Sequence, residues 1–221
     1  MSLHVPATMP DAIAETLRAR ILDQSEAPGS ALTESAVALR FGVARPTARI
    51  AIERLVADGL LRREAHRAAR VPELTRDDIV DLFATRRLIE GAATASLAHG
   101  GTIPADALAA HRDLLDVART GGPFAAQDAA FHRALASGSP SPRLARMHGA
   151  LMGEIELCIG QVQAHDLMAG TDVAAQHQRI LDAVTAGDAT AAADLARAHI
   201  DAAGAALLSH YDASHRQDPH A

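Results

Sequence analysis

Residues 28–61 read PGSALTESAVALRFGVARPTARIAIERLVADGLL, and this stretch decides how the first third of the chain folds. Thr33 is a good N-cap for a short helix over ESAVALRF, which Gly42 closes. A second helix follows, with Pro46 in its first turn, where proline is tolerated, and it ends at Gly59. Its apolar face consists of Ile50, Ile52, Leu55 and Val56. Two short helices joined by a tight turn that contains glycine predict a helix-turn-helix.

The flanking segments complete a small domain. Upstream, DAIAETLRARILDQ carries Ile13, Leu17 and Ile21 at helical spacing, which predicts a helix with one buried stripe. Downstream, LLRREAHRAARV offers two short extended runs around a basic turn, which is typical of a two-stranded wing. We therefore expect a winged helix-turn-helix domain over residues 1–73.

The rest of the chain, residues 74–221, shows only helical periodicity. Glycine and proline breaks separate the expected helices, which cover roughly 75–99, 104–118, 121–138, 141–166, 171–186 and 188–211. The whole chain of 221 residues contains five aromatic residues, no tryptophan and one cysteine, Cys158. This composition argues against an aromatic β-sheet core and excludes a disulfide framework. The predicted fold class is mainly α, with an all-helical bundle behind the winged domain.

Charge is distributed unevenly along the chain. The total is −6, yet residues 40–70 hold eight arginines against three acids, a local balance of +5. Such a patch suggests a surface for a polyanion, although a solvated arginine face remains the alternative. Arg45 and Arg49 lie four apart, hence on one face at the start of the second helix, where a recognition helix contacts base edges.

Residues 28–61 resemble the winged-helix DNA-binding domain of the GntR family of bacterial transcription regulators. The later segments DIVDLFATRRLIEGAATASLA, DAAFHRAL and AAQHQRILDAVTAGDATAAADLARAHI resemble the FCD ligand-binding domain of its FadR-type branch. The resemblance covers nearly the whole chain. It implies a cytoplasmic homodimer that binds double-stranded DNA at an inverted-repeat operator.

Ala44 and Thr47 lie near Arg45 and Arg49 and could contact sugar, phosphate or a thymine methyl, and Arg67 joins them as a candidate DNA-binding residue. The family pattern usually has Ser-Arg-Thr-Pro where this chain has Ala-Arg-Pro-Thr, so one hydroxyl contact is missing. Arg67 belongs to the wing, where arginines would contact the DNA backbone or the minor groove. An exposed arginine without a DNA contact is the alternative for each arginine.

The resemblance also points to a divalent-metal site made by Asp128, His132, His177 and His199. Asp128 and His132 are four apart and project from one side of a helix, whereas the other two histidines lie on later helices. Any one of these histidines alone would be read as an ordinary surface or core imidazole. Together they suit zinc, with nickel, manganese or iron as alternatives, and helical bundles commonly build such sites from facing helices.

Family resemblance further implies a small organic-acid or sugar-acid effector bound at or near the metal. Arg86 is the candidate partner for the effector's carboxylate, because a guanidinium matches a carboxylate bidentately. The alternative for Arg86 is an intrahelical salt bridge to Glu90, four residues along, and Arg87 is a weaker candidate for the same role.

The sequence therefore predicts a transcription regulator, not an enzyme, whose affinity for DNA is controlled by a small carboxylate. One rival is a metal-dependent enzyme with Glu154 or Glu156 as its base, and another is a helical scaffold that binds no DNA. No apolar stretch approaches the ~18 residues that a membrane span needs, and no export signal is visible. We expect a soluble, cytoplasmic protein.

Overall fold

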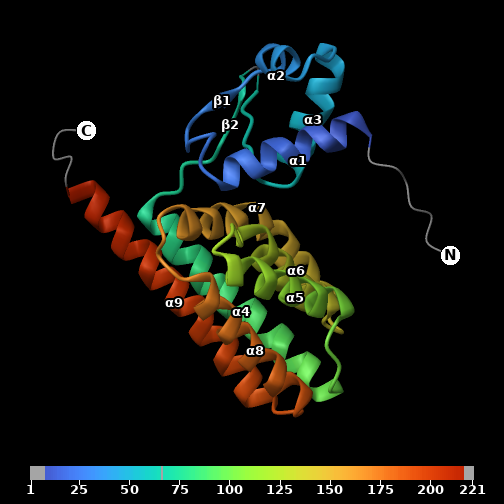
Figure 1. Ribbon diagram of the computed structural model, residues 1–221, viewed down its shortest axis with the longest axis vertical. Coiled ribbons are helices and arrows are strands. Elements are labelled where there is room, and N and C mark those ends of the chain that lie inside the picture. Colours follow the sequence, from blue (N-terminus) through green and yellow to red (C-terminus); the bar gives the residue numbers. More distant parts are fainter. Residues whose placement is uncertain (1–7, 66, 217–221) are drawn as a thin grey trace. The chain divides into compact units, whose positions relative to one another are not determined.

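The computed structural model describes residues 8–65 and 67–216, and it divides into two compact units, Met1–Glu73 and Leu74–Ala221. Each unit is helical with a minimal two-stranded sheet in the first (Figure 1). The predicted fold class is confirmed. Within the described residues, no helix combines the length and the apolar character that crossing a membrane would require.

The N-terminal unit forms the predicted helices. Its elements are α1 (Met9–Leu22), β1 (Ala31–Leu32), α2 (Glu34–Phe41), α3 (Arg45–Ala57) and β2 (Ala69–Arg70). The hydroxyl of Thr33 accepts a hydrogen bond from the Ala36 amide at 3.1 Å, and Gly42 ends α2 with a φ of 63°. A residue with a side chain rarely adopts that left-handed conformation, so glycine suits this turn. The core of the unit is a set of fully buried aliphatic side chains that includes Ile13, Leu17, Ile21, Ile52 and Leu55.

The wing differs in detail from its prediction. β1 and β2 pair antiparallel, with Ala31 opposite Arg70 and Leu32 opposite Ala69. The first of the two predicted wing runs contributes only Arg62, which forms an antiparallel bridge with Arg70 through amide–carbonyl bonds of 2.8 Å in both directions. The wing is thus stabilised by pairing of β2 with β1, because a two-stranded hairpin of this length is not stable alone.

The C-terminal unit is an all-helical bundle. Its elements are α4 (Arg76–Gly100), α5 (Ala105–Thr120), α6 (Ala125–Gly138), α7 (Pro142–Ala164), α8 (Gly170–Thr185) and α9 (Ala189–Arg216). These bounds agree with the predicted ranges to within about two residues, except that α9 continues to Arg216 instead of ending at residue 211, and that α6 starts late. That helix begins at Ala125 rather than at residue 121, because Gly121 caps α5 with a φ of 67°. The side chain of Gln163 on α7 then accepts hydrogen bonds from the amides of Phe124 and Ala125.

The two longest helices, α4 and α9, run side by side in opposite directions (Figure 1). They approach closely at Gly204, where an added Cβ would lie 2.8 Å from the ring of Phe83. One apolar cluster joins α4, α6, α7 and α9 around Phe83, Ile155, Ile159 and Ile200. A second cluster joins α4 to α5, α6, α8 and α9 around Phe131. The buried polar residues described below lie on the same helices.

Candidate nucleic-acid interface and metal centre

The first candidate site is the N-terminal end of α3. Ala44 is the N-cap of this helix and its side chain makes no capping hydrogen bond, which follows from the absence of the family's serine hydroxyl. Ala44, Arg45 and Arg49 are exposed, whereas Thr47 is half-buried. The exposed guanidinium groups at this helix end form a surface suited to phosphate oxygens and base edges.

The arginines of this surface have partners that an anion could replace. Arg45 donates to the hydroxyl of Ser35 on α2, a residue that the sequence analysis did not single out. The Nε atom of Arg49 lies 2.7 Å from a carboxylate oxygen of Glu53, one helical turn away, and 61% of the Arg49 side chain is exposed. In the wing, Arg67 is 73% exposed and pairs with Glu64 at 2.8 Å. Such exposed pairs are weak and leave the guanidinium groups available.

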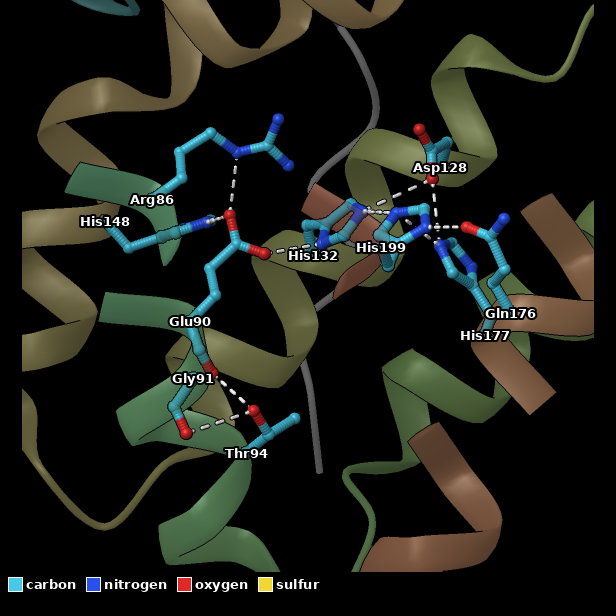
Figure 2. A network of polar contacts seen from close by, with 10 residues as sticks. All are labelled: Arg86, Glu90, Gly91, Thr94, Asp128, His132, His148, Gln176, His177 and His199. Carbon is cyan, nitrogen blue, oxygen red and sulfur yellow. Dashed lines mark hydrogen bonds and ion pairs between the residues drawn. The ribbon is translucent and has the colours of Figure 1, made fainter. Parts of the chain in front are cut away.

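The second candidate site lies inside the helical unit. α6 carries Asp128 and His132, α8 carries His177 and α9 carries His199. All four side chains are more than nine-tenths buried. One potential ligand atom from each lies within 4.8 Å of every other, and Figure 2 shows the four side chains converging. The structure therefore brings together the four residues that the sequence analysis assigned to a metal.

The spacing of these atoms fits a shared cation. The Nε2 atom of His199 lies 3.1 Å from that of His132 and 3.4 Å from that of His177. One oxygen of Asp128, Oδ1, lies 3.4 Å from the Nε2 atom of His132 and 3.1 Å from that of His177. Ligand bonds of about 2.0–2.1 Å at tetrahedral or octahedral angles put neighbouring ligand atoms about 2.9–3.4 Å apart.

The donor set has the chemistry of a metal site as well as its dimensions. The Asp128 Oδ1 atom is buried and accepts no well-oriented hydrogen bond, although it faces two imidazoles. A buried carboxylate oxygen without such a bond is costly unless a cation completes its surroundings. Three imidazole nitrogens and one carboxylate oxygen suit a borderline transition metal. The residues present therefore fit a divalent ion of this class.

Burial and partners shift the pKa values of the metal-free group in opposite directions. Burial opposes ionisation of Asp128, but the adjacent imidazoles of His132 and His177 hold its pKa well below the usual range. Burial lowers the pKa of His177 to about 4, despite Asp128 beside it. Burial likewise disfavours a charge on His132, yet Glu90 and Asp128 raise its pKa to about 9.

Two further residues orient the imidazoles from outside the group. The Nδ1–H of His132 donates to Glu90 at 2.6 Å, and the Nδ1–H of His199 donates to Gln176 at 2.6 Å. Each bond leaves the Nε2 atom of that imidazole directed at the common centre (Figure 2). Hydrogen bonds of this kind usually support histidine ligands. His177 is instead held by stacking on Phe131, with ring centroids 3.8 Å apart.

Glu90 also contacts the arginine assigned to the effector. The Nε atom of Arg86 donates to Glu90 at 2.9 Å, so the intrahelical salt bridge considered as the alternative is present. His148 on α7 lies 3.2 Å from the same carboxylate oxygen. Burial opposes ionisation of Glu90, but Arg86, His132 and His148 together hold its pKa well below the usual range. The terminal nitrogens of Arg86 point away from Glu90 (Figure 2), so the salt bridge does not occupy them.

The sequence analysis missed Glu90 as a partner of His132, and it missed Gln176 and His148 altogether. Position in the sequence gives a weak signal for Gln176, which immediately precedes His177. Nothing in the spacing links Glu90 on α4 to His132 on α6, because the two residues meet only through the packing of their helices. A family of aligned sequences would be needed to detect such pairs.

A narrow cavity adjoins the group of Asp128, His132, His177 and His199. Its polar wall consists of Arg86, Asp128, His132 and His199. Its apolar wall consists of Phe83, Phe124, Ile159, Val162, Met168 and Val173 together with Ala203. The guanidinium carbon of Arg86 lies 5.2 Å from the ring centroid of Phe83, which holds the cation against the cavity wall.

Family models match both units. The model described as "Bacterial regulatory proteins, gntR family" matches residues 10–71, and the FCD domain model matches residues 81–202. The second match alone covers more than half of the chain. The Asp128 and histidine group lies wholly within the FCD match.

Named relatives agree with these matches. A "Probable D-xylose utilization operon transcriptional repressor" of Paenarthrobacter nicotinovorans is 28% identical over 163 residues, which cover 72% of this chain and 71% of the relative. An uncharacterized HTH-type transcriptional regulator BphR of Paraburkholderia xenovorans (strain LB400) is 28% identical over 201 residues, 86% of this chain and 82% of the relative. A crystal structure of a transcriptional regulator GntR from Rhodococcus sp. RHA1 superposes with a TM-score of 0.68 at 28% identity, covering 90% of this chain and 97% of that one. This chain therefore belongs to the GntR family, as a DNA-binding transcriptional regulator with a winged helix-turn-helix domain and an FCD domain.

Proposed function

We propose that this chain is a homodimeric repressor of the FadR-type branch, released from an inverted-repeat operator when a small carboxylate binds beside a metal in its FCD domain. The observation that carries the proposal is the convergence of Asp128, His132, His177 and His199 around one point next to a buried arginine. The Paenarthrobacter relative is named as a transcriptional repressor, which supports repression.

In the DNA-binding domain, Arg45 and Arg49 contact base edges or phosphates in the major groove. Their exposure at the start of α3 supports this assignment, since the first residues of a recognition helix reach the bases. Ala44 offers its backbone amide to a phosphate, and Thr47 contacts sugar or a thymine methyl. Arg67 places the wing on the DNA backbone. A dimer would present two such helices to an operator with two-fold symmetry.

In the FCD domain, the four converging residues hold a divalent ion, for which zinc is our first choice and nickel, manganese or iron are alternatives. An ion held there supplies a Lewis-acidic centre with positions left over for the oxygen atoms of a carboxylate. Arg86 binds the same carboxylate with its terminal nitrogens. Burial supports both roles, because a charged ligand interacts more strongly where water is excluded.

Control of DNA binding then follows from linkage. If the effector weakens operator binding by some factor, the operator weakens effector binding by the same factor. The family and its named relatives point to regulation rather than catalysis. We therefore do not favour the metal-dependent enzyme.

The test separates the two domains. An Asp128→Ala, His177→Ala double variant is expected to lose its bound metal and its response to carboxylates while it still binds DNA from its own upstream region. Metal content is measured by elemental analysis, and DNA binding by gel shift at several salt concentrations, because phosphate contacts make binding salt-dependent. A His99→Ala, His215→Ala variant, which removes two exposed histidines bonded to their own helices, serves as the control. Unchanged metal content in the double variant would rule out the proposed metal site. If the wild-type chain does not bind DNA from its own upstream region, that region is not its operator.

A further inference from the structure

The walls of the cavity beside the metal centre restrict what can bind there. Among the described lining residues, the polar side chains are those of Arg86 and of three of the four candidate ligands. The remaining wall is hydrocarbon, aromatic ring or thioether. No serine, threonine, asparagine, glutamine or tyrosine is among the described residues that line the cavity. A bound molecule with several hydroxyl groups would therefore leave most of them without hydrogen-bond partners, which binding sites avoid.

The charges at the site restrict the ligand further. Asp128, Glu90 and Arg86 are all buried, and two carboxylates with one guanidinium leave a net formal charge of −1. Imidazoles that coordinate a metal are neutral. A divalent cation would bring the net charge of the group to +1, which one monoanion neutralises. A dianion would place an extra buried negative charge in a site with no second free cation among its described wall residues.

The size of the cavity is the third restriction. Its free space is about 10 Å³, which is roughly one water position. Phe124 and Met168 line both this cavity and a hollow of about 320 Å³ on the outside of the same unit. A ligand with a carbon chain enters where these two side chains separate the hollow from the cavity. Methionine has three rotatable bonds and adapts its shape readily, so Met168 can make room for a short chain.

From these three observations we infer that the effector is a monocarboxylic acid with a short apolar body, and not a dicarboxylic acid or a polyhydroxylated sugar acid. The inference rests on the proposed function, because it assumes a metal held by the four converging residues. It narrows that function to one class of acid. Arg86 and the metal bind the carboxylate, and Ile159, Val162 and Met168 surround the hydrocarbon part.

Binding of defined acids to the full chain loaded with Zn²⁺ tests this inference. Calorimetry at constant pH and ionic strength compares acetate, propionate and butyrate with succinate and D-xylonate. Affinity is expected to rise about fourfold per methylene from acetate to butyrate, the gain expected for burying each methylene. Butyrate is expected to bind at least about tenfold more tightly than succinate or xylonate. Butyrate binding should fall sharply when a chelator removes the metal, because the carboxylate then loses the cation to which it would bind.

A matched pair of variants tests the apolar wall. Val162→Thr places a hydroxyl of nearly the same size in the cavity, whereas Val184→Thr makes the same change at a buried valine of a different cluster. The first variant should bind butyrate several-fold more weakly. The ratio of its affinity for butyrate to its affinity for 2-hydroxybutyrate should also be smaller than in the wild type. The second should leave the ratio of the two affinities unchanged. Thermal melting of both variants separates loss of binding from loss of folding.

The outcomes distinguish this inference from the function on which it rests. If succinate or xylonate binds as tightly as butyrate, the inference is wrong and the metal-dependent carboxylate sensor still stands. If zinc binds but no acid does, both fail. If butyrate binds equally well after chelation, the charge argument is wrong.

Discussion

An arginine and a glutamate one helical turn apart form an ion pair in each of the two units, on the surface in one unit and in the interior in the other. Arg49 and Glu53 on α3 are four residues apart and 2.7 Å from nitrogen to oxygen, and Arg86 and Glu90 on α4 have the same spacing at 2.9 Å. The first pair is 61% and 48% exposed, whereas the second is 2% and 7% exposed. The two pairs have the same spacing and similar distances and differ in burial, which determines how strong each pair is and whether a ligand can replace one partner.

The exposed pair is dispensable for the fold and free for a ligand. Water and salt screen its attraction, so a phosphate can replace Glu53 as the partner of Arg49 at little expense. The buried pair cannot be opened in this way. Glu90 has Arg86, His132 and His148 around it, and removing the carboxylate would leave a buried guanidinium without an anion. Surface pairs thus suit reversible recognition, and buried pairs suit the positioning of a site.

Replacing the two glutamates should give the largest contrast. Glu90→Ala is expected to lower the stability of the FCD domain by about 3–5 kcal/mol, because it leaves buried charge unpaired. Glu53→Ala should change the stability of the DNA-binding domain by no more than about 0.5 kcal/mol. Thermal melting followed by circular dichroism measures both. Equal shifts for the two variants would show that burial does not govern the strength of these pairs.

The next effect concerns DNA. Arg49→Ala should weaken operator binding about 5–150-fold, the equivalent of one lost base contact of about 1–3 kcal/mol. Glu53→Ala should bind at least as well as wild type, because it removes a negative charge beside the phosphates. Fluorescence anisotropy with a labelled operator gives both affinities. Arg119→Ala removes another exposed arginine, paired with Asp116 in the other domain, and is the control. Undiminished affinity of Arg49→Ala would remove Arg49 from the interface.

Two neighbouring glutamines on α8 offer a finer comparison: Gln176 is half-buried and Gln178 is exposed. Gln176 accepts from the Nδ1–H of His199, a candidate ligand, whereas Gln178 lies 2.9 Å from the Nε2 atom of His111, which is not one. Gln176→Ala should weaken zinc binding about 10–100-fold, as loss of an orienting partner usually does. Gln178→Ala should leave zinc affinity nearly unchanged. Competition with a chromophoric chelator measures this, and equal losses would deny Gln176 an orienting role.

The smallest effect concerns acid stability of the DNA-binding domain. Glu26 is buried there, and although burial opposes its ionisation, hydrogen bonds from Arg20 and Arg40 lower its pKa below the usual 4.5. The stability it contributes is therefore fully present above pH 4.5 and is lost as the pH falls through the lowered pKa. Glu26→Gln should flatten the loss of α1 and α2 amide signals in an NMR titration from pH 6 to about pH 3. A wild-type titration curve in the variant would contradict this assignment.

Much of the architecture was predictable because its signals are local. Thr33, Gly42 and Pro46 mark helix ends through their own backbone preferences, so α2 and α3 lie where the sequence placed them. The start of α6 was predicted too early: Gly121 caps α5, and the amides of Phe124 and Ala125 at the start of α6 bond to Gln163, a residue on another helix. Spacing could not reveal that contact.

For the candidate metal centre too, some residues were identified from the sequence and others only from the structure. Resemblance to a family identified Asp128, His132, His177 and His199 from the sequence, and their metal-binding role stays a prediction. Only the tertiary structure joined Glu90 on α4 to His132 on α6 and surrounded the neighbouring cavity with apolar side chains. The physical reason is that helix formation depends on residues within one or two turns, whereas burial and charge pairing depend on side chains that meet only when distant helices pack.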